Sequence, residues 1–112
     1  MLTQEVTRYI REFVAPRVSP VLSLYLDVNP ANPDNQGKAP LLRAREAIAA
    51  TQAPPEVGKK VLEALERNLP QARSRVIFAA EGWMEIYDLQ VDLPLVQGAE
   101  ARWGEPYLTP IL

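Results

Sequence analysis

Two aspartates lie around the end of the first hydrophobic run of the chain. Asp27 follows the run 21–26 directly, and Asp34 lies in the turn-rich segment after it. Carboxylates at a strand end could serve acid–base chemistry or bind magnesium. Asp and Asn also form turns by hydrogen bonding to their own backbone, and the sequence favours this interpretation. A small hydrolase using Asp27 and Asp34 is therefore the weakest of three hypotheses, because it needs both carboxylates in one pocket.

The chain contains neither cysteine nor histidine. The absence of cysteine excludes disulfides, thiolate chemistry and cysteine zinc sites. The absence of histidine removes the side chain best suited to proton transfer near neutral pH, and with it Ser-His-Asp triads and most catalytic zinc sites. We therefore predict that the protein is not an enzyme, and that it has no catalytic residue, no metal site and no cofactor.

Basic residues that could contact phosphate gather in two segments with helical spacing. Arg43 and Arg45 lie in the first segment, and Lys59 and Lys60 lie near the start of the second. Gly58 precedes the lysines, but they do not belong to a phosphate-binding loop, because the earlier glycine and the following Ser or Thr of that pattern are absent. The alternative is a solvated helix start in which Lys60 pairs with Glu56. We retain the four cations as candidate RNA-binding residues, with Lys59 and Lys60 first.

The charge of the chain is unevenly distributed. Residues 1–75 hold 11 basic and 8 acidic side chains, whereas residues 76–112 hold 1 and 6, for a net charge of −2. This asymmetry can orient a domain near an anionic partner. However, the net charge of +3 over residues 1–75 is much lower than the positive charge of a dedicated nucleic-acid-binding domain. We therefore expect weak RNA binding by this chain alone, and no DNA partner.

Length and hydropathy predict a single small globular domain. The 112 residues are 47% hydrophobic and 23% charged, close to the average for soluble proteins, and long enough to bury a hydrophobic core. The N-terminus does not resemble a signal peptide, and no run approaches the roughly 18 apolar residues of a membrane span. We expect a soluble, cytoplasmic protein without a membrane partner.

The elements that position the candidate residues follow from the spacing of apolar residues. We expect an N-terminal helix at 3–14, strands at 21–26, 74–80 and 83–89, helices at 40–51 and 56–69, and a last strand at 91–96 or 99–103. The Pro-rich corner between the two central helices predicts an antiparallel hairpin with its tip around 52–59. The fold class is α+β, an antiparallel sheet of about four strands with the helical hairpin and the N-terminal helix packed on it.

Aromatic residues are concentrated in the acidic part of the chain. Trp83, Tyr87 and Trp103 could stack on bases, as aromatic residues do in single-strand binders. Because cations are not interleaved with these rings, core packing is the favoured interpretation. Tyr25, in the first hydrophobic run, is likewise expected in the core.

Three segments and the helical hairpin together resemble a known family. Val21-Leu-Ser-Leu-Tyr-Leu26, Arg75-Val-Ile-Phe-Ala79 and Pro106-Tyr-Leu-Thr-Pro-Ile-Leu112 are similar to the N-terminal domain of archaeo-eukaryotic release factors and Pelota. The chain looks most like the bacterial release-factor-like proteins, and the resemblance covers most of it from Val21 onward. The resemblance implies that residues 1–112 form one α+β domain, the first of a longer protein, which docks on the ribosome in rescue, stalling or hibernation.

The resemblance does not extend to the family's functional motifs. In true release factors the hairpin tip carries Asn-Ile-Lys-Ser and reads stop codons, whereas Val57-Gly-Lys-Lys60 stands here, with Lys59 matching the motif's lysine. The family's Tyr-x-Cys motif falls near Phe78-Ala79-Ala80, and Gly-Gly-Gln does not occur. The implied role is therefore noncatalytic binding to ribosomal RNA without stop-codon reading.

A protein-interaction or dimerisation module with no RNA role is the alternative function. The chain ends on the apolar sequence 107–112, and a large exposed apolar patch usually marks an interface. This hypothesis predicts self-association through the C-terminal segment.

Overall fold

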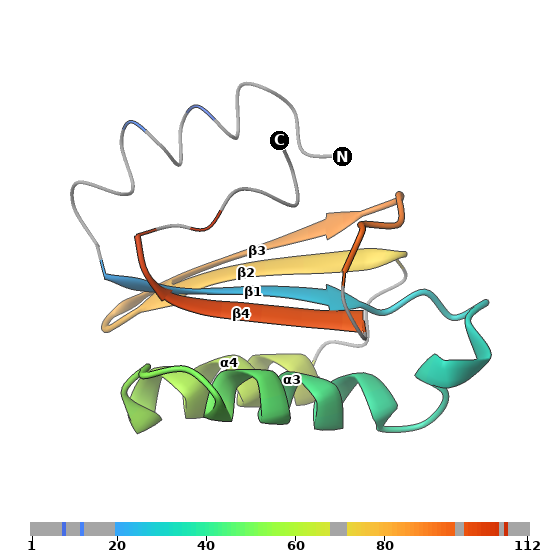
Figure 1. The fold of residues 1–112 in the computed structure, drawn as a ribbon, viewed down its shortest axis with the longest axis horizontal. Coiled ribbons are helices and arrows are strands. Elements are labelled where there is room, and N and C mark those ends of the chain that lie inside the picture. Colours follow the sequence, from blue (N-terminus) through green and yellow to red (C-terminus); the bar gives the residue numbers. More distant parts are fainter. Residues whose placement is uncertain are drawn as a thin grey trace.

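The structure is a computed structural model that describes residues 20–67, 72–95, 98–105 and 107, together with Arg8 and Glu12. The elements in chain order are β1 (Val21–Asp27), the 3-10 turn η2 (Pro33–Asn35), α3 (Ala39–Ala49), α4 (Pro55–Arg67), β2 (Ser74–Ala80), β3 (Trp83–Leu89) and β4 (Ala99–Gly104). The two helices lie side by side under one face of the sheet (Figure 1). The N-terminal helix expected at 3–14 lies outside the described residues.

The four strands form one antiparallel sheet in the order β3-β2-β1-β4. The strand β1 is central, because it pairs with β2 on one side and with β4 on the other. Its first six residues are all buried, as expected of a continuous hydrophobic run that is covered on both faces. The α+β fold class, the four-stranded antiparallel sheet and the helical hairpin packed on it are thereby confirmed.

The residues of each strand alternate between the two faces of the sheet. Leu24 lies opposite Ile77 of β2 and Ala101 of β4, so these three side chains share the face covered by α3 and α4. The next residue, Tyr25, is paired with Val76 and points to the other face. The core is therefore divided between two faces. On the helix face the buried side chains are Leu22, Leu24, Leu26, Val28, Ala44, Ile48, Val57, Val61, Leu65, Ala72, Ile77 and Ala79.

The helices and the β2–β3 turn follow local rules. In α4 the residues Val57, Val61 and Leu65 recur at helical spacing and are buried. The two-residue turn between β2 and β3 contains Gly82, whose φ of +74° is accessible to glycine at no steric cost. Of the two segments considered for the last strand, the structure contains β4, and residues 91–95 form no strand. Among the described residues, no helix is both long and apolar enough to cross a membrane.

Candidate functional site

The connection between α3 and α4 is a short, internally bonded turn. Thr51 donates its Oγ1 proton to the carbonyl of Ile48 over 2.7 Å, and the same Oγ1 accepts from the Ala53 amide. The amides of Val57 and Gly58 donate to the Pro54 carbonyl at 3.0 and 3.2 Å. We call residues 50–59 the hairpin tip. These bonds fix its backbone, so side chains at the tip are presented in a defined arrangement.

Gly58 allows the two helices to approach closely at the tip. A Cβ atom at this position would lie 2.9 Å from Cγ2 of Ile48 on the facing helix, which is shorter than carbon atoms tolerate. Gly58 is itself buried. The glycine next to Lys59 therefore serves the contact between helices and not a phosphate-binding loop.

Lys60 is bound to the sheet and is not available at the tip. Its Nζ donates to the carbonyl oxygens of Ala80 at 2.6 Å and Trp83 at 3.0 Å, the two residues that flank the β2–β3 turn. The ammonium group of Lys60 is therefore directed to these two carbonyls and not to Glu56, the partner considered from the sequence. Lys60 thus joins α4 to the end of the sheet.

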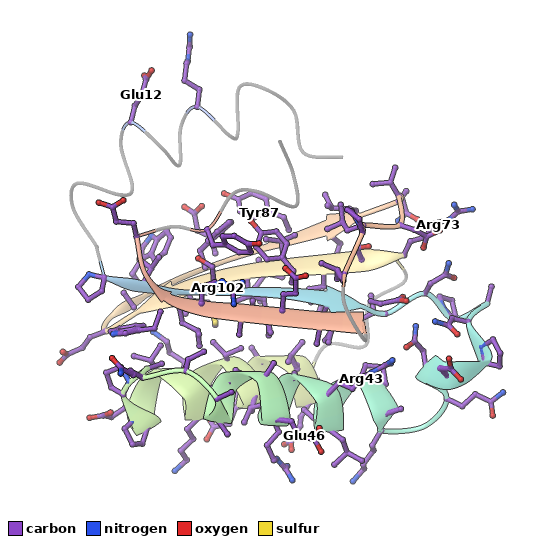
Figure 2. The ribbon with its side chains drawn as sticks, in the orientation of Figure 1. Glu12, Arg43, Glu46, Arg73, Tyr87 and Arg102 are labelled. Carbon is purple, nitrogen blue, oxygen red and sulfur yellow. The ribbon has the colours of Figure 1, made fainter. Side chains whose placement is uncertain are left out.

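Arg43 is likewise engaged within the fold. Its Nη2 donates to the side-chain oxygen of Asn35 and to the carbonyl of Asp34, so α3 is tied to the loop after β1 (Figure 2). The guanidinium also lies against Gly98, where a Cβ would come within 2.8 Å of Nη1. The structure therefore places Arg43 far from the tip and in a structural role, whereas the sequence put it among the RNA-binding candidates.

Arg45 and Lys59 are the candidate cations that the structure brings together. Both are exposed, and both line a shallow groove of about 530 Å³ on the outer side of the helical hairpin. Glu63 and Glu66 line the same groove, so its charges cancel. The groove has no net positive field. Contact with phosphate at this place would depend on the individual side chains of Arg45 and Lys59.

Asp27, the last residue of β1, forms a turn, as the sequence favours. Asp27 accepts hydrogen bonds from the Asn29 amide at 3.0 Å, from Nδ2 of Asn32 at 3.1 Å and from Nδ2 of Asn35 at 2.9 Å. Asp34 is exposed and its amide is capped by the Asn32 side chain. The carboxylate of Asp27 therefore organises the Asn-rich loop, and its hydrogen-bonding partners are amides.

The face of the sheet opposite the helices carries a cluster of tyrosines. The Tyr25 hydroxyl donates to the Tyr107 carbonyl, and the two rings meet edge to face with centroids 5.8 Å apart. The Tyr107 amide donates to Oγ of Ser23 at 3.0 Å, and Arg102 lies 4.9 Å above the Tyr107 ring. Burial first, and then the neighbouring Tyr107 and Glu100, raise the pKa of Tyr25 above its usual value. Tyr25 is therefore neutral at physiological pH.

The aromatic residues considered for base stacking pack as core residues. Trp83 and Tyr87 are half-buried against the cluster that contains Tyr25, and Trp103 is half-buried against the helix-face core. Tyr25, which was expected in the core, is fully buried. Tyr107 begins the apolar ending that was considered as a dimer contact, and it is packed on its own sheet. Residues 108–112 lie outside the described residues.

Comparison with protein-family models, with curated proteins and with solved structures finds no match to this chain. Functional inference therefore rests on the residues of the chain and on the resemblance stated above. Among the described residues there is also no group of three or more Asp and Glu side chains arranged to hold a metal ion.

Sequence reasoning did not identify the roles of Arg102 and Tyr107. The residues of β4 alternate strictly, with Glu100 and Arg102 between Ala99, Ala101 and Trp103. This period of two is the signal that could have assigned the two charged side chains to one face of a strand.

Proposed function

We propose that the protein is a noncatalytic, ribosome-facing domain of a cytoplasmic translation protein related to the release-factor-like proteins it resembles. In this proposal it is the first domain of a longer chain, and it acts in rescue, stalling or hibernation without reading stop codons. The observation that carries the proposal is the helical hairpin on the sheet, which presents the exposed Lys59 at its tip beside Arg45. The resemblance assigns the contact with ribosomal RNA to this tip.

The number of free cations limits the strength of the interaction. Of the four candidate cations, Lys60 and Arg43 are bound within the fold, which leaves Arg45 and Lys59 for phosphate oxygens. Each phosphate contact contributes about 0.7 to 0.9 to the slope of log K against log salt concentration. Two contacts give a modest salt dependence, so the 112-residue chain should bind more weakly than a longer protein with further contacts.

Cosedimentation with bacterial ribosomes at two salt concentrations tests the proposal. The full-length gene product and this chain are compared in parallel, and the full-length protein should bind in a salt-sensitive manner. Failure of the full-length protein to bind at either salt concentration would refute the ribosomal function.

Charge-removing variants of Lys59 on α4 and Arg45 on α3 test the role of the groove at the tip. Lys59→Ala and Arg45→Ala should each lower the slope of the salt dependence by about 0.7 to 0.9. Arg67→Ala is the matched control, because it removes an exposed cation from the other end of α4. Equal effects of Lys59→Ala and Arg67→Ala would mean that the tip is not the contact.

A further inference from the structure

Among the described strands, β4 stands at one edge of the sheet. Among the described residues it pairs with β1 alone, because it stands last in the order β3-β2-β1-β4. Figure 1 shows β4 at the margin of the sheet, with α3 beneath it. Every second residue of β4 therefore directs its backbone N–H and C=O away from β1, where no described strand pairs with them. Such an edge can be extended by another strand.

The side chains of β4 have a pattern that suits pairing with itself. Glu100 and Arg102 lie on the face opposite the helices, opposite Tyr25 and Ser23 of β1. Ala99, Ala101 and Trp103 lie on the helix face and pack against its core. The strand therefore carries one acid and one base two residues apart on one face, and two small residues with one large residue on the other.

We propose that two copies of this chain associate through antiparallel pairing of their β4 strands, about a twofold axis at Ala101, to form a continuous eight-stranded sheet. In this register Glu100 of each copy lies opposite Arg102 of the other, and Ala99 lies opposite Trp103. Directly opposed residues in an antiparallel pair have Cβ atoms about 5 Å apart, so the opposite charges meet and the indole lies over a small residue.

The charges select this register over its neighbours. A symmetric antiparallel pair is centred on a residue, and a shift by one residue in a strand moves its side chains to the other face. Centring the axis on Glu100 would place the two Glu100 side chains opposite each other, and centring it on Arg102 would do the same with the arginines. Like charges directly opposite destabilise a sheet. Ala101 is the centre at which both charged pairs are complementary.

The other edge of the sheet does not share this pattern. The strand β3 contains Glu85 and Asp88 and no basic residue. Glu85 and Asp88 lie on opposite faces of β3, and Asp88 is bonded to Arg75 of β2, so pairing of β3 with itself would form no complementary charge pair between copies. The complementary charges of β4 identify a second copy of the chain as the occupant of its edge.

The position of α3 is compatible with this dimer. The helix lies under β1 and β4, so the two α3 helices of the dimer would run about 8 to 10 Å apart, given a strand spacing of about 4.8 Å. Arg43 marks the side of α3 toward the start of β4, because its guanidinium lies against Gly98. Ala47 shares this side one helical turn further along α3, and its small side chain permits a close approach.

Sedimentation equilibrium with charge-reversed variants tests the dimer. Wild-type protein should self-associate, whereas Glu100→Arg alone and Arg102→Glu alone should each associate at least about tenfold more weakly, since each dimer then opposes like charges. An equimolar mixture of the two variants should associate as wild type does, because both opposed pairs are again complementary. Glu100 accepts from the Tyr107 hydroxyl at 3.4 Å and Arg102 lies over the Tyr107 ring, so each variant loses a contact with Tyr107. Mixing does not restore these contacts, and the mixture therefore controls for their loss.

Each outcome of this experiment decides the proposal. Wild-type protein that stays monomeric at millimolar concentration overturns it, as do single variants that associate as tightly as wild type. Failure of the mixture to restore association, with both variants folded by circular dichroism, overturns the register at Ala101. The proposed interface does not include Arg45 or Lys59. Loss of dimerisation in Glu100→Arg or Arg102→Glu should therefore leave ribosome binding unchanged.

Discussion

Replacement of Lys60 by methionine tests whether this residue supports the fold. Lys60→Met keeps the unbranched aliphatic chain but removes the ammonium group that donates to the carbonyls of Ala80 and Trp83 at 2.6 and 3.0 Å. Hydrogen bonds to charged groups contribute about 1.5 to 3 kcal/mol in favourable settings. Because Lys60 is half-buried and water can replace part of the interaction, we expect a loss of about 1 to 2 kcal/mol.

Urea denaturation followed by circular dichroism measures this loss. The midpoint should fall while the m-value stays unchanged, and the melting temperature should fall by roughly 4 to 10 °C for a domain of this size. Lys59→Met is the matched control, because the Lys59 side chain is exposed. Removal of its ammonium group should change the free energy of unfolding by less than about 0.5 kcal/mol. Equal stability of the two variants would show that the contacts of Lys60 with the β2–β3 turn do not stabilise the protein.

Four other substitutions probe the sheet and its connections. Asp88→Ala should lower the free energy of unfolding by about 2 to 3 kcal/mol, because the buried Arg75 loses a carboxylate bonded at 2.7 and 3.0 Å. Asp92→Ala, which breaks an exposed ion pair at 3.6 Å, should cost less than about 1 kcal/mol, and the same urea denaturation assay measures both variants. Burial raises the pKa of Tyr25, so above pH of about 10 the unfolded chain loses the proton first and stability falls by up to about 1.4 kcal/mol per pH unit. Urea titrations at a series of alkaline pH values measure this dependence, and Tyr25→Phe should remove the part of it that Tyr25 contributes. An unchanged dependence of the unfolding free energy on pH in this variant would mean that other groups cause it. Gly82→Ala should cost about 1 kcal/mol in urea denaturation because of its φ of +74°, and a neutral result would contradict that turn geometry.

The elements of the fold could be predicted because each is determined over a short stretch of chain. The hydrophobic run 21–26 specifies a strand that is buried on both faces, and the apolar spacing of Val57, Val61 and Leu65 specifies one buried side of α4. The two prolines between the helices require a corner, and Glu81-Gly82 suits a tight turn. The choice between 91–96 and 99–103 for the last strand could not be made locally, because it depends on which segment pairs with β1.

The candidate site was predicted less well, because residue type does not reveal how a side chain is used. Lys59 and Lys60 are identical neighbours in the sequence, yet one is exposed and the other donates to two carbonyls of a strand turn about 20 residues away in the chain. Arg43 and Arg45 differ in the same way.

The sequence alone determined the strands at 21–26, 74–80 and 83–89, the two central helices, the turn-forming role of Asp27 and the short list of cations, because these depend on hydrophobic period and turn chemistry within a few residues. Only the tertiary structure decided which cations are exposed, and that Glu100 and Arg102 lie together on one face of an edge strand. The physical reason is that hydrogen bonds such as those of Lys60, and the position of β4 at the margin of the sheet, join residues far apart in the chain. Their partners are fixed by the packing of whole elements, which local sequence does not specify.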